Sequence, residues 1–280
     1  MVFLNFFHYN DFDKAGDIMH INRLSLVHSL TSVINDSPQD DVNYTLAYYF
    51  LQHYHELDEL NIYDVAAQCY VSRSSVRRFC KEIGYENFKD LKHNFKEFDE
   101  QFHQLLSNND QENYREWLTN EINSMMKELD QRMNTNEVDV IIDKIHDSRE
   151  VVFLTSGSST MPVKEFQRSM IVCGKIIRII SDANVDYVID SLTEQDYLIT
   201  VSATGHFAKE VKAVVEKSKA YNVLITANRS QELKKPYHKV YHLSAKDYAM
   251  QKSVYGKYGI SYMLDILFSI YVKKYGEKVK

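Results

Sequence analysis

Residues 61–95, NIYDVAAQCYVSRSSVRRFCKEIGYENFKDLKHNF, constrain the fold of this chain most strongly, because they carry two short helical patterns separated by a tight turn. Apolar residues recur at helical spacing in residues 62–69 and again in residues 76–83, so each segment is expected to bury one face of a helix. Ser72 stands where an N-cap belongs, and Gly84 occupies the C′ position that favours glycine. The spacing therefore predicts a helix-turn-helix.

Positive charge gathers on the second of these helices. From Ser72 to Lys96 there are seven Lys or Arg residues against three acidic ones, a local charge of +4 in a chain whose net charge is −6. In a helix-turn-helix, the first residues of the second helix enter the major groove, where arginines reach guanine edges or phosphates. A solvated basic face on an ordinary helical pair is the alternative. We predict a DNA-binding surface made of Ser72, Arg73, Ser74, Ser75, Arg77, Arg78, Lys81 and Lys89.

Within this set we expect different roles. Arg73 and Arg77 are the candidates for reading bases, because they fall in the first turns of the second helix. Arg78, Lys81 and Lys89 are expected to contact phosphates. The serines are small enough to let the helix approach the duplex closely.

The residues of this segment also fit a known pattern, Val-Ser-x-x-Ser/Thr-Val-x-Arg-Phe, followed by Gly-aromatic and then Phe-x-x-Leu-Lys. Its anchors are present as Val71, Ser72, Ser75, Val76, Arg78, Phe79, Gly84, Tyr85, Phe88, Leu91 and Lys92. In these positions the chain resembles the RpiR family of bacterial transcriptional regulators. The resemblance implies a DNA-binding head at this end of the chain.

Length and composition bound what the rest can be. With 280 residues, 44% apolar and 26% charged, the chain is typical of a globular protein with room for two domains. Cys69, Cys80 and Cys173 form no CxxC pair or ligand-like cluster, so we expect reduced thiols, a cytoplasmic protein, no metal and no cofactor. The N-terminus lacks a basic leader, and the apolar run at residues 262–272 is too short for a membrane span. We expect no membrane association.

After residue 150 the pattern changes to short apolar runs that alternate with helical segments. Strands are expected at residues 151–155, 175–180, 197–202, 223–226 and 239–243, with helices at 161–173, 185–192, 208–220 and 254–274. Such alternation is typical of a parallel sheet with helices on both faces. The predicted fold class is α + α/β: an all-helical helix-turn-helix head followed by a doubly wound parallel five-stranded sheet. We place the DNA-binding domain at residues 1–97, a helical connector at 98–136 and the α/β domain at 137–280.

Ligands of such sheets gather at the carboxyl ends of the strands, which draws attention to the loops after the first and third strands. The predicted ligand-binding residues are Ser156, Gly157, Ser158 and Ser159 in the first loop, and Ser202, Thr204, Gly205 and His206 in the second. Hydroxyls and glycine at the start of a helix favour an anion such as phosphate. The same residues are also common turn and cap residues, which is the alternative interpretation.

Residues 137–275, with these two loops, resemble the sugar isomerase (SIS) domain, which follows the helix-turn-helix in RpiR regulators and binds phosphosugars. The first loop fits the family pattern Gly-x-Gly/Ser-Ser. The second departs from Ser-x-Ser-Gly-x-Thr, because His206 and Phe207 stand at its last two positions. The resemblance implies an SIS fold and a phosphorylated sugar as effector.

Three functions follow as hypotheses. The first is a transcriptional regulator of sugar or amino-sugar metabolism that binds an operator as a homodimer or homotetramer, with affinity modulated by a phosphosugar. The second is a regulator whose α/β domain only dimerises. The third is a sugar-phosphate isomerase, for which His206 and Glu165 are the obvious bases near the loops. We expect a regulator without enzymatic activity.

Overall fold

The computed structural model describes residues 26–92, 113–133, 136–155, 159–180, 185–248 and 253–276. Predictions for residues 1–25, for residues 93–97 at the end of the DNA-binding domain and for residues 98–112 of the connector lie outside these ranges.

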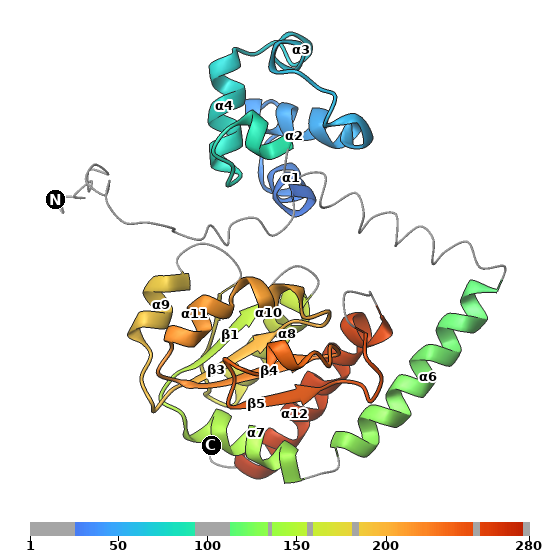
Figure 1. Cartoon of the computed structure of the whole chain (residues 1–280), viewed down its shortest axis with the longest axis vertical. Helices are drawn as coiled ribbons and strands as arrows, with labels where there is room; N and C mark the ends of the chain where they lie inside the picture. Colours follow the sequence, from blue (N-terminus) through green and yellow to red (C-terminus); the bar gives the residue numbers. More distant parts are fainter. Residues whose placement is uncertain are drawn as a thin grey trace.

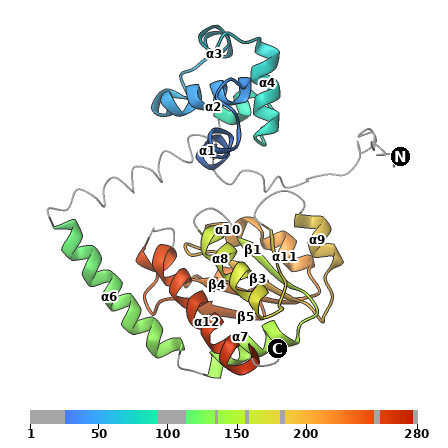
Figure 2. The same cartoon turned by 180° about the vertical axis from the view of Figure 1, so that it is seen from behind.

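The head is all-helical, as predicted (Figures 1 and 2). It comprises α1 (Leu26–Asp36), α2 (Val42–Gln52), the 3-10 turn η1 (Tyr54–Glu56), α3 (Ile62–Gln68) and α4 (Arg73–Glu82). Residues 88–92 are again helical. The ring of Phe50 on α2 stacks at 5.9 Å on Phe79 of α4 and at 6.0 Å on Phe88, measured between centroids. These aromatic residues are therefore core, in agreement with their helical spacing.

The second part alternates strands and helices. The strands are β1 (Val151–Thr155), β2 (Ile177–Ile180), β3 (Tyr197–Val201), β4 (Tyr221–Thr226) and β5 (Lys239–His242). The helices are α6 (Tyr114–Met133), α7 (Asn136–Asp147), α8 (Thr160–Val172), α9 (Val185–Ser191), α10 (His206–Glu210), α11 (Lys212–Lys217) and α12 (Ile260–Tyr275). Short 3-10 and π turns, η3 (Gln231–Leu233) and η4 (Tyr255–Gly259), complete it.

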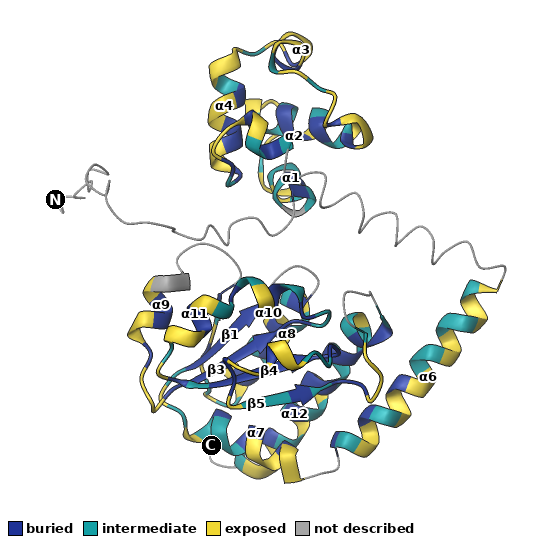
Figure 3. Ribbon diagram, viewed as in Figure 1, coloured by how far each residue is buried: buried dark blue, intermediate teal, exposed yellow. Residues whose placement is uncertain are grey.

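All strand pairs are parallel, in the order β2-β1-β3-β4-β5. Alternate residues of β1 face opposite layers, as the two-residue period of a strand requires. Val151 and Phe153 pack with α6, α7, α8 and α12, whereas Val152 and Leu154 pack with α9, α10 and α11. Figure 3 shows the strands buried between these layers. The predicted doubly wound five-stranded sheet is confirmed.

Two expected helices differ in detail. The segment predicted at 208–220 is two helices, α10 and α11, which are separated by a turn at Val211. The segment predicted at 254–274 begins with the π-helical turn η4. No helix among the described residues is both long and apolar enough to span a membrane.

The turn η4 is enclosed on two sides. A Cβ added at Gly259 would lie 3.3 Å from Leu129 and Met125 of α6, and one added at Gly256 would lie 3.0 Å from Ala203 Cβ in the loop after β3. The Tyr255 hydroxyl donates a hydrogen bond of 2.5 Å to Glu128 on α6. One turn of chain therefore fills the space between α6 and this loop.

Candidate nucleic-acid interface and ligand-binding loops

The helix-turn-helix is built by local caps and a shared apolar face. Asn61 Oδ1 accepts hydrogen bonds from Tyr63 N and Asp64 N at 2.9 and 3.0 Å, which fixes the start of α3. Ser72 Oγ accepts from Ser75 N at 3.1 Å and fixes the start of α4, as predicted. The apolar residues that join the two helices to the core are Val65, Ala66, Cys69, Val76, Phe79 and Cys80. Burial raises the pKa of the Cys80 thiol to about 12, so this cysteine stays a protonated core residue.

Both helices end in the same backbone motif. After α4, Gly84 has a φ of +93°, and Tyr85 N bonds Cys80 O at 2.8 Å. After α3, Tyr70 has a φ of +54°, and Val71 N bonds Ala66 O at 2.9 Å. These are Schellman caps, in which the left-handed position is usually a glycine. Gly84 was predicted from its residue type, whereas a tyrosine at the corresponding position gave no such signal.

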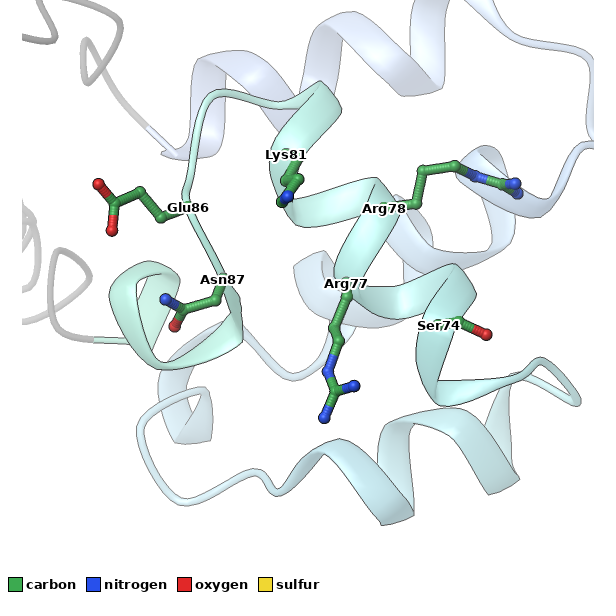
Figure 4. A pocket seen from close by; sticks show the side chains of 6 residues that line it. All are labelled: Ser74, Arg77, Arg78, Lys81, Glu86 and Asn87. Carbon is green, nitrogen blue, oxygen red and sulfur yellow. The ribbon is translucent and has the colours of Figure 1, made fainter. Parts of the chain in front are cut away.

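The outer face of α4 is positively charged and hollowed (Figure 4). A shallow pocket is lined by Ser74, Arg77, Arg78, Lys81, Glu86 and Asn87. Arg77 and Lys81 are exposed, and neither has a carboxylate within ion-pair distance among the described residues. Arg78 lies 3.8 Å from Glu82, with 68% of its side chain exposed. Uncompensated cations on an exposed helix face are what phosphate recognition requires.

The other predicted DNA-binding residues differ in the contacts that they make within the head. Ser72 is exposed, but its hydroxyl is engaged by the backbone and by Ser74 and Ser75, so it acts first as a cap. The Arg73 guanidinium lies 4.7 Å from the ring centroid of Tyr63, a cation–π contact that holds it at the start of α4. Lys89 is exposed in the helical segment that follows.

The sequence interpretation missed the far wall of this pocket. Asn87 Oδ1 caps the next helical segment by accepting from Asp90 N at 3.0 Å, and Glu86 lies beside it. Asn87 stands three residues before Asp90, at the start of an apolar run, and this spacing is typical of a helix start. The pattern could have predicted that a helix begins at this side of the pocket.

The two predicted ligand-binding loops leave neighbouring strands. Thr155 of β1 and Val201 of β3 are register partners, so both loops begin at the same edge of the sheet. The direction of strand order also reverses between β1 and β3, which makes this the switch point where doubly wound sheets bind ligands. Ser156, Gly157 and Ser158 lie outside the described residues. Ser159 is buried before α8, and the buried Thr155 Oγ1 has no hydrogen-bond partner among the described residues.

In the second loop, the predicted hydroxyls serve local structure. The buried Ser202 Oγ accepts from Ala208 N at 3.1 Å, and Thr204 Oγ1 accepts from His206 N at 3.4 Å. Asn228 Nδ2 donates to Thr204 O at 2.8 Å and fixes the loop to the end of β4.

Gly205 and His206 complete this loop. Gly205 has a φ of +82°, and an added Cβ would lie 2.6 Å from Asn228 Nδ2, so the position needs glycine. His206 Nδ1 lies 2.9 Å from Glu210 Oε1, which offsets the charge that this histidine was expected to bring to an anion. No group of three or more His, Cys, Asp or Glu residues in the described part of the chain could hold a metal ion.

The capped helix pair and its exposed cations define a helix-turn-helix domain. Residues 29–101 match the family model described as a helix-turn-helix domain of the rpiR family. This part of the chain, which contains α3 and α4, therefore matches an rpiR-family helix-turn-helix domain, and the predicted resemblance is confirmed for the head. No curated protein matches the chain.

Solved structures show weaker likenesses. The Vibrio vulnificus NanR protein, in complex with ManNAc-6P, is 17% identical over 90% of this chain and 94% of its own, with a TM-score of 0.48. The sugar isomerase domain of an RpiR transcription factor from Sphaerobacter thermophilus is 12% identical over 57% of this chain and 92% of its own, with a TM-score of 0.46. The protein MJ1247 from Methanococcus jannaschii, with an inferred function as 3-hexulose-6-phosphate isomerase, is 15% identical over 58% of this chain and 92% of its own, with a TM-score of 0.45.

Proposed function

We propose that this protein is a transcriptional regulator of sugar or amino-sugar metabolism, which binds duplex DNA through α4 and whose affinity responds to a phosphorylated sugar. The DNA-binding role rests on one observation: Arg77 and Lys81 lie exposed on α4, in the part that matches the rpiR-family helix-turn-helix model, and neither has an ion-pair partner among the described residues. In this proposal residues 1–97 bind DNA, residues 98–136 connect, and residues 137–280 hold the ligand. Met125 and Leu129 of α6 pack into the core of the sheet, so the end of the proposed connector is joined to the α/β part.

The regulatory mechanism is thermodynamic linkage. An operator with two half-sites requires two heads, so we propose a homodimer or homotetramer in the cytoplasm. A ligand that binds one arrangement of the heads more tightly shifts the population that fits the operator. By reciprocity, bound DNA changes the affinity for the ligand by the same factor.

The DNA-binding role is tested by removing Arg77. The wild-type protein first selects a duplex from a random-sequence pool, and affinity is then measured by fluorescence anisotropy. Arg77→Ala is expected to weaken binding by about 1–3 kcal/mol if Arg77 contacts a base in bidentate fashion. Arg168→Ala, which removes an exposed arginine of α8, is the matched control. Unchanged affinity in Arg77→Ala would remove this residue from the proposed role.

The ligand is tested by thermal shift with a panel of hexose and amino-hexose phosphates. A compound present at 100 times its Kd stabilises the folded state by about 2.7 kcal/mol. Ser202→Ala is a suitable variant to pair with the wild type, because its hydroxyl lies in the loop after β3. A positive shift in the wild type that is weaker in the variant supports the proposed site.

A second candidate function is a regulator whose α/β domain only dimerises. It is favoured by the loop after β3, where Ser202 and Thr204 cap local structure and His206 is paired with Glu210. No response to any sugar phosphate, together with a stable dimer in sedimentation analysis, would favour it over the first proposal.

An isomerase activity has little support from the side chains. Of the two bases near the loops, His206 is paired with Glu210, and Glu165 is exposed and lies 2.8 Å from Arg168. We therefore propose a protein without enzymatic activity. Turnover of a ketose or aldose phosphate by the purified protein, abolished in His206→Ala, would reverse this conclusion.

A further inference from the structure

Tyr70, in the turn between α3 and α4, takes the left-handed position of the Schellman cap that ends α3. Its φ of +54° lies in the left-handed region, which is strained for a residue with a Cβ. The side chain is 96% exposed, so it gains no packing in return. Gly84 occupies the corresponding position after α4 without this strain. The cap after α3 requires the left-handed backbone but not the tyrosine side chain, so a strained, exposed tyrosine at this position is a reason to look for function.

The position of Tyr70 indicates what that function is. Tyr70 lies two residues before Ser72, the N-cap of α4, so their Cα atoms are at most about 7 Å apart. The N-terminal end of the second helix is the end that a helix-turn-helix directs at DNA. The same end carries Arg73, held against the ring of Tyr63, and the exposed Arg77. An exposed phenol beside these cations is placed to meet a polyanion.

We infer that Tyr70 contacts the bound duplex by donating its phenolic O–H to a phosphate oxygen next to the groove that α4 enters. This inference rests on the proposed DNA-binding function and adds a residue to its interface. Tyrosine is among the side chains that bond phosphates in protein–DNA complexes, and a hydrogen bond to a charged acceptor is stronger than a neutral one. Because the phenol is uncharged, the contact releases no counterion.

The experiment compares Tyr70→Gly and Tyr70→Phe in the full-length chain, by anisotropy with the duplex selected by the wild type. Tyr70→Gly relieves the left-handed strain, so it is expected to raise the melting temperature while weakening DNA binding about tenfold. Tyr70→Phe keeps the ring and is expected to show the same loss of affinity. In both variants the dependence of affinity on salt stays that of the wild type, whereas Lys81→Ala, which removes a proposed phosphate contact, reduces the steepness of that dependence by about one. Tyr187→Phe, at an exposed tyrosine of α9, is the control for losing a surface hydroxyl.

The outcomes separate this inference from the function on which it rests. Wild-type affinity in both Tyr70 variants, with weaker binding in Arg77→Ala, overturns the Tyr70 contact and leaves the DNA-binding function intact. Wild-type affinity in Tyr70→Phe alone overturns the hydroxyl–phosphate bond. If the wild type selects no duplex and Arg77→Ala changes nothing, the DNA-binding function itself fails.

Discussion

The Asp196 carboxylate provides a quantitative test of the electrostatics of the α/β domain. It is buried before β3, and it accepts hydrogen bonds from the Arg149 guanidinium at 2.9 and 2.6 Å, from Glu150 N at 3.1 Å, and from Thr193 N and Oγ1 at 2.7 and 2.9 Å. Burial raises the pKa of this carboxyl, but the donors outweigh burial and lower the pKa of Asp196 from 3.8 to about 2. This carboxylate joins the start of β3 to the start of β1.

The size of its contribution follows from that pKa. A carboxyl that titrates near 2 when folded and near 3.8 when unfolded stabilises the fold by about 2.4 kcal/mol at neutral pH. Since the folded pKa is the lower one, this stability is present above about pH 5 and is lost as the pH falls toward 2. Asp196→Asn removes the charge and turns one acceptor into a donor that faces N–H groups. Removing one partner of a buried pair costs about 3–5 kcal/mol, and the 53% exposure of Arg149 reduces this to about 2–3 kcal/mol.

Urea unfolding between pH 7 and pH 3 measures this difference. Trp117 on α6, the only tryptophan of the sequence, provides the fluorescence signal. Glu165→Gln is the control, because the exposed Glu165–Arg168 pair is expected to contribute at most about 0.5 kcal/mol. Two results would refute the reasoning. One is a loss of less than about 1 kcal/mol in the free energy of unfolding of Asp196→Asn at pH 7. The other is a difference in unfolding free energy between variant and wild type that is the same at pH 3 as at pH 7.

Three further predictions concern the loops and the head. Gly205→Ala is expected to destabilise the protein by about 2 kcal/mol or more in thermal melts, because it adds left-handed strain and a 2.6 Å approach to Asn228. Tyr255→Phe leaves Glu128 without one donor, so urea unfolding is expected to show a loss of about 1–2 kcal/mol. Tyr63→Ala is expected to weaken DNA binding by releasing Arg73, whereas Tyr63→Phe keeps the aromatic face and binds nearly as the wild type; equal affinity in the alanine variant would contradict this.

Sequence patterns predicted the parts of this fold that depend on residue type. Ser72 and Gly84 mark helix ends because only a few residue types suit those positions, and the strands of a doubly covered sheet are continuous apolar runs. The expected start of the fourth strand, residue 223, was wrong by two residues, because Tyr221 and Asn222 are polar enough to resemble a turn. The left-handed Tyr70 was not predictable, since a tyrosine there contradicts its own preference.

Structural features of the candidate site could be predicted in the same uneven way. The cations of α4 were found because charge contrast is visible in a sequence, and their exposure follows from helical spacing. The capping bonds of Ser202 and the pairing of His206 with Glu210 depend on how the chain turns after β3. A hydroxyl that caps a helix and one that meets a ligand look alike in a sequence.

The enclosed turn η4 has a mechanical consequence. At Gly256 and Gly259 there is no room for even one more methyl group without displacing a neighbour, and those neighbours are Ala203 after β3 and the side chains of α6. Close-packed interiors do not deform gradually, so a displacement of the loop after β3 is transmitted through η4 to α6, and the reverse also holds. We therefore expect the loop after β3, at the sheet's switch point, and α6, in the proposed connector, to move together.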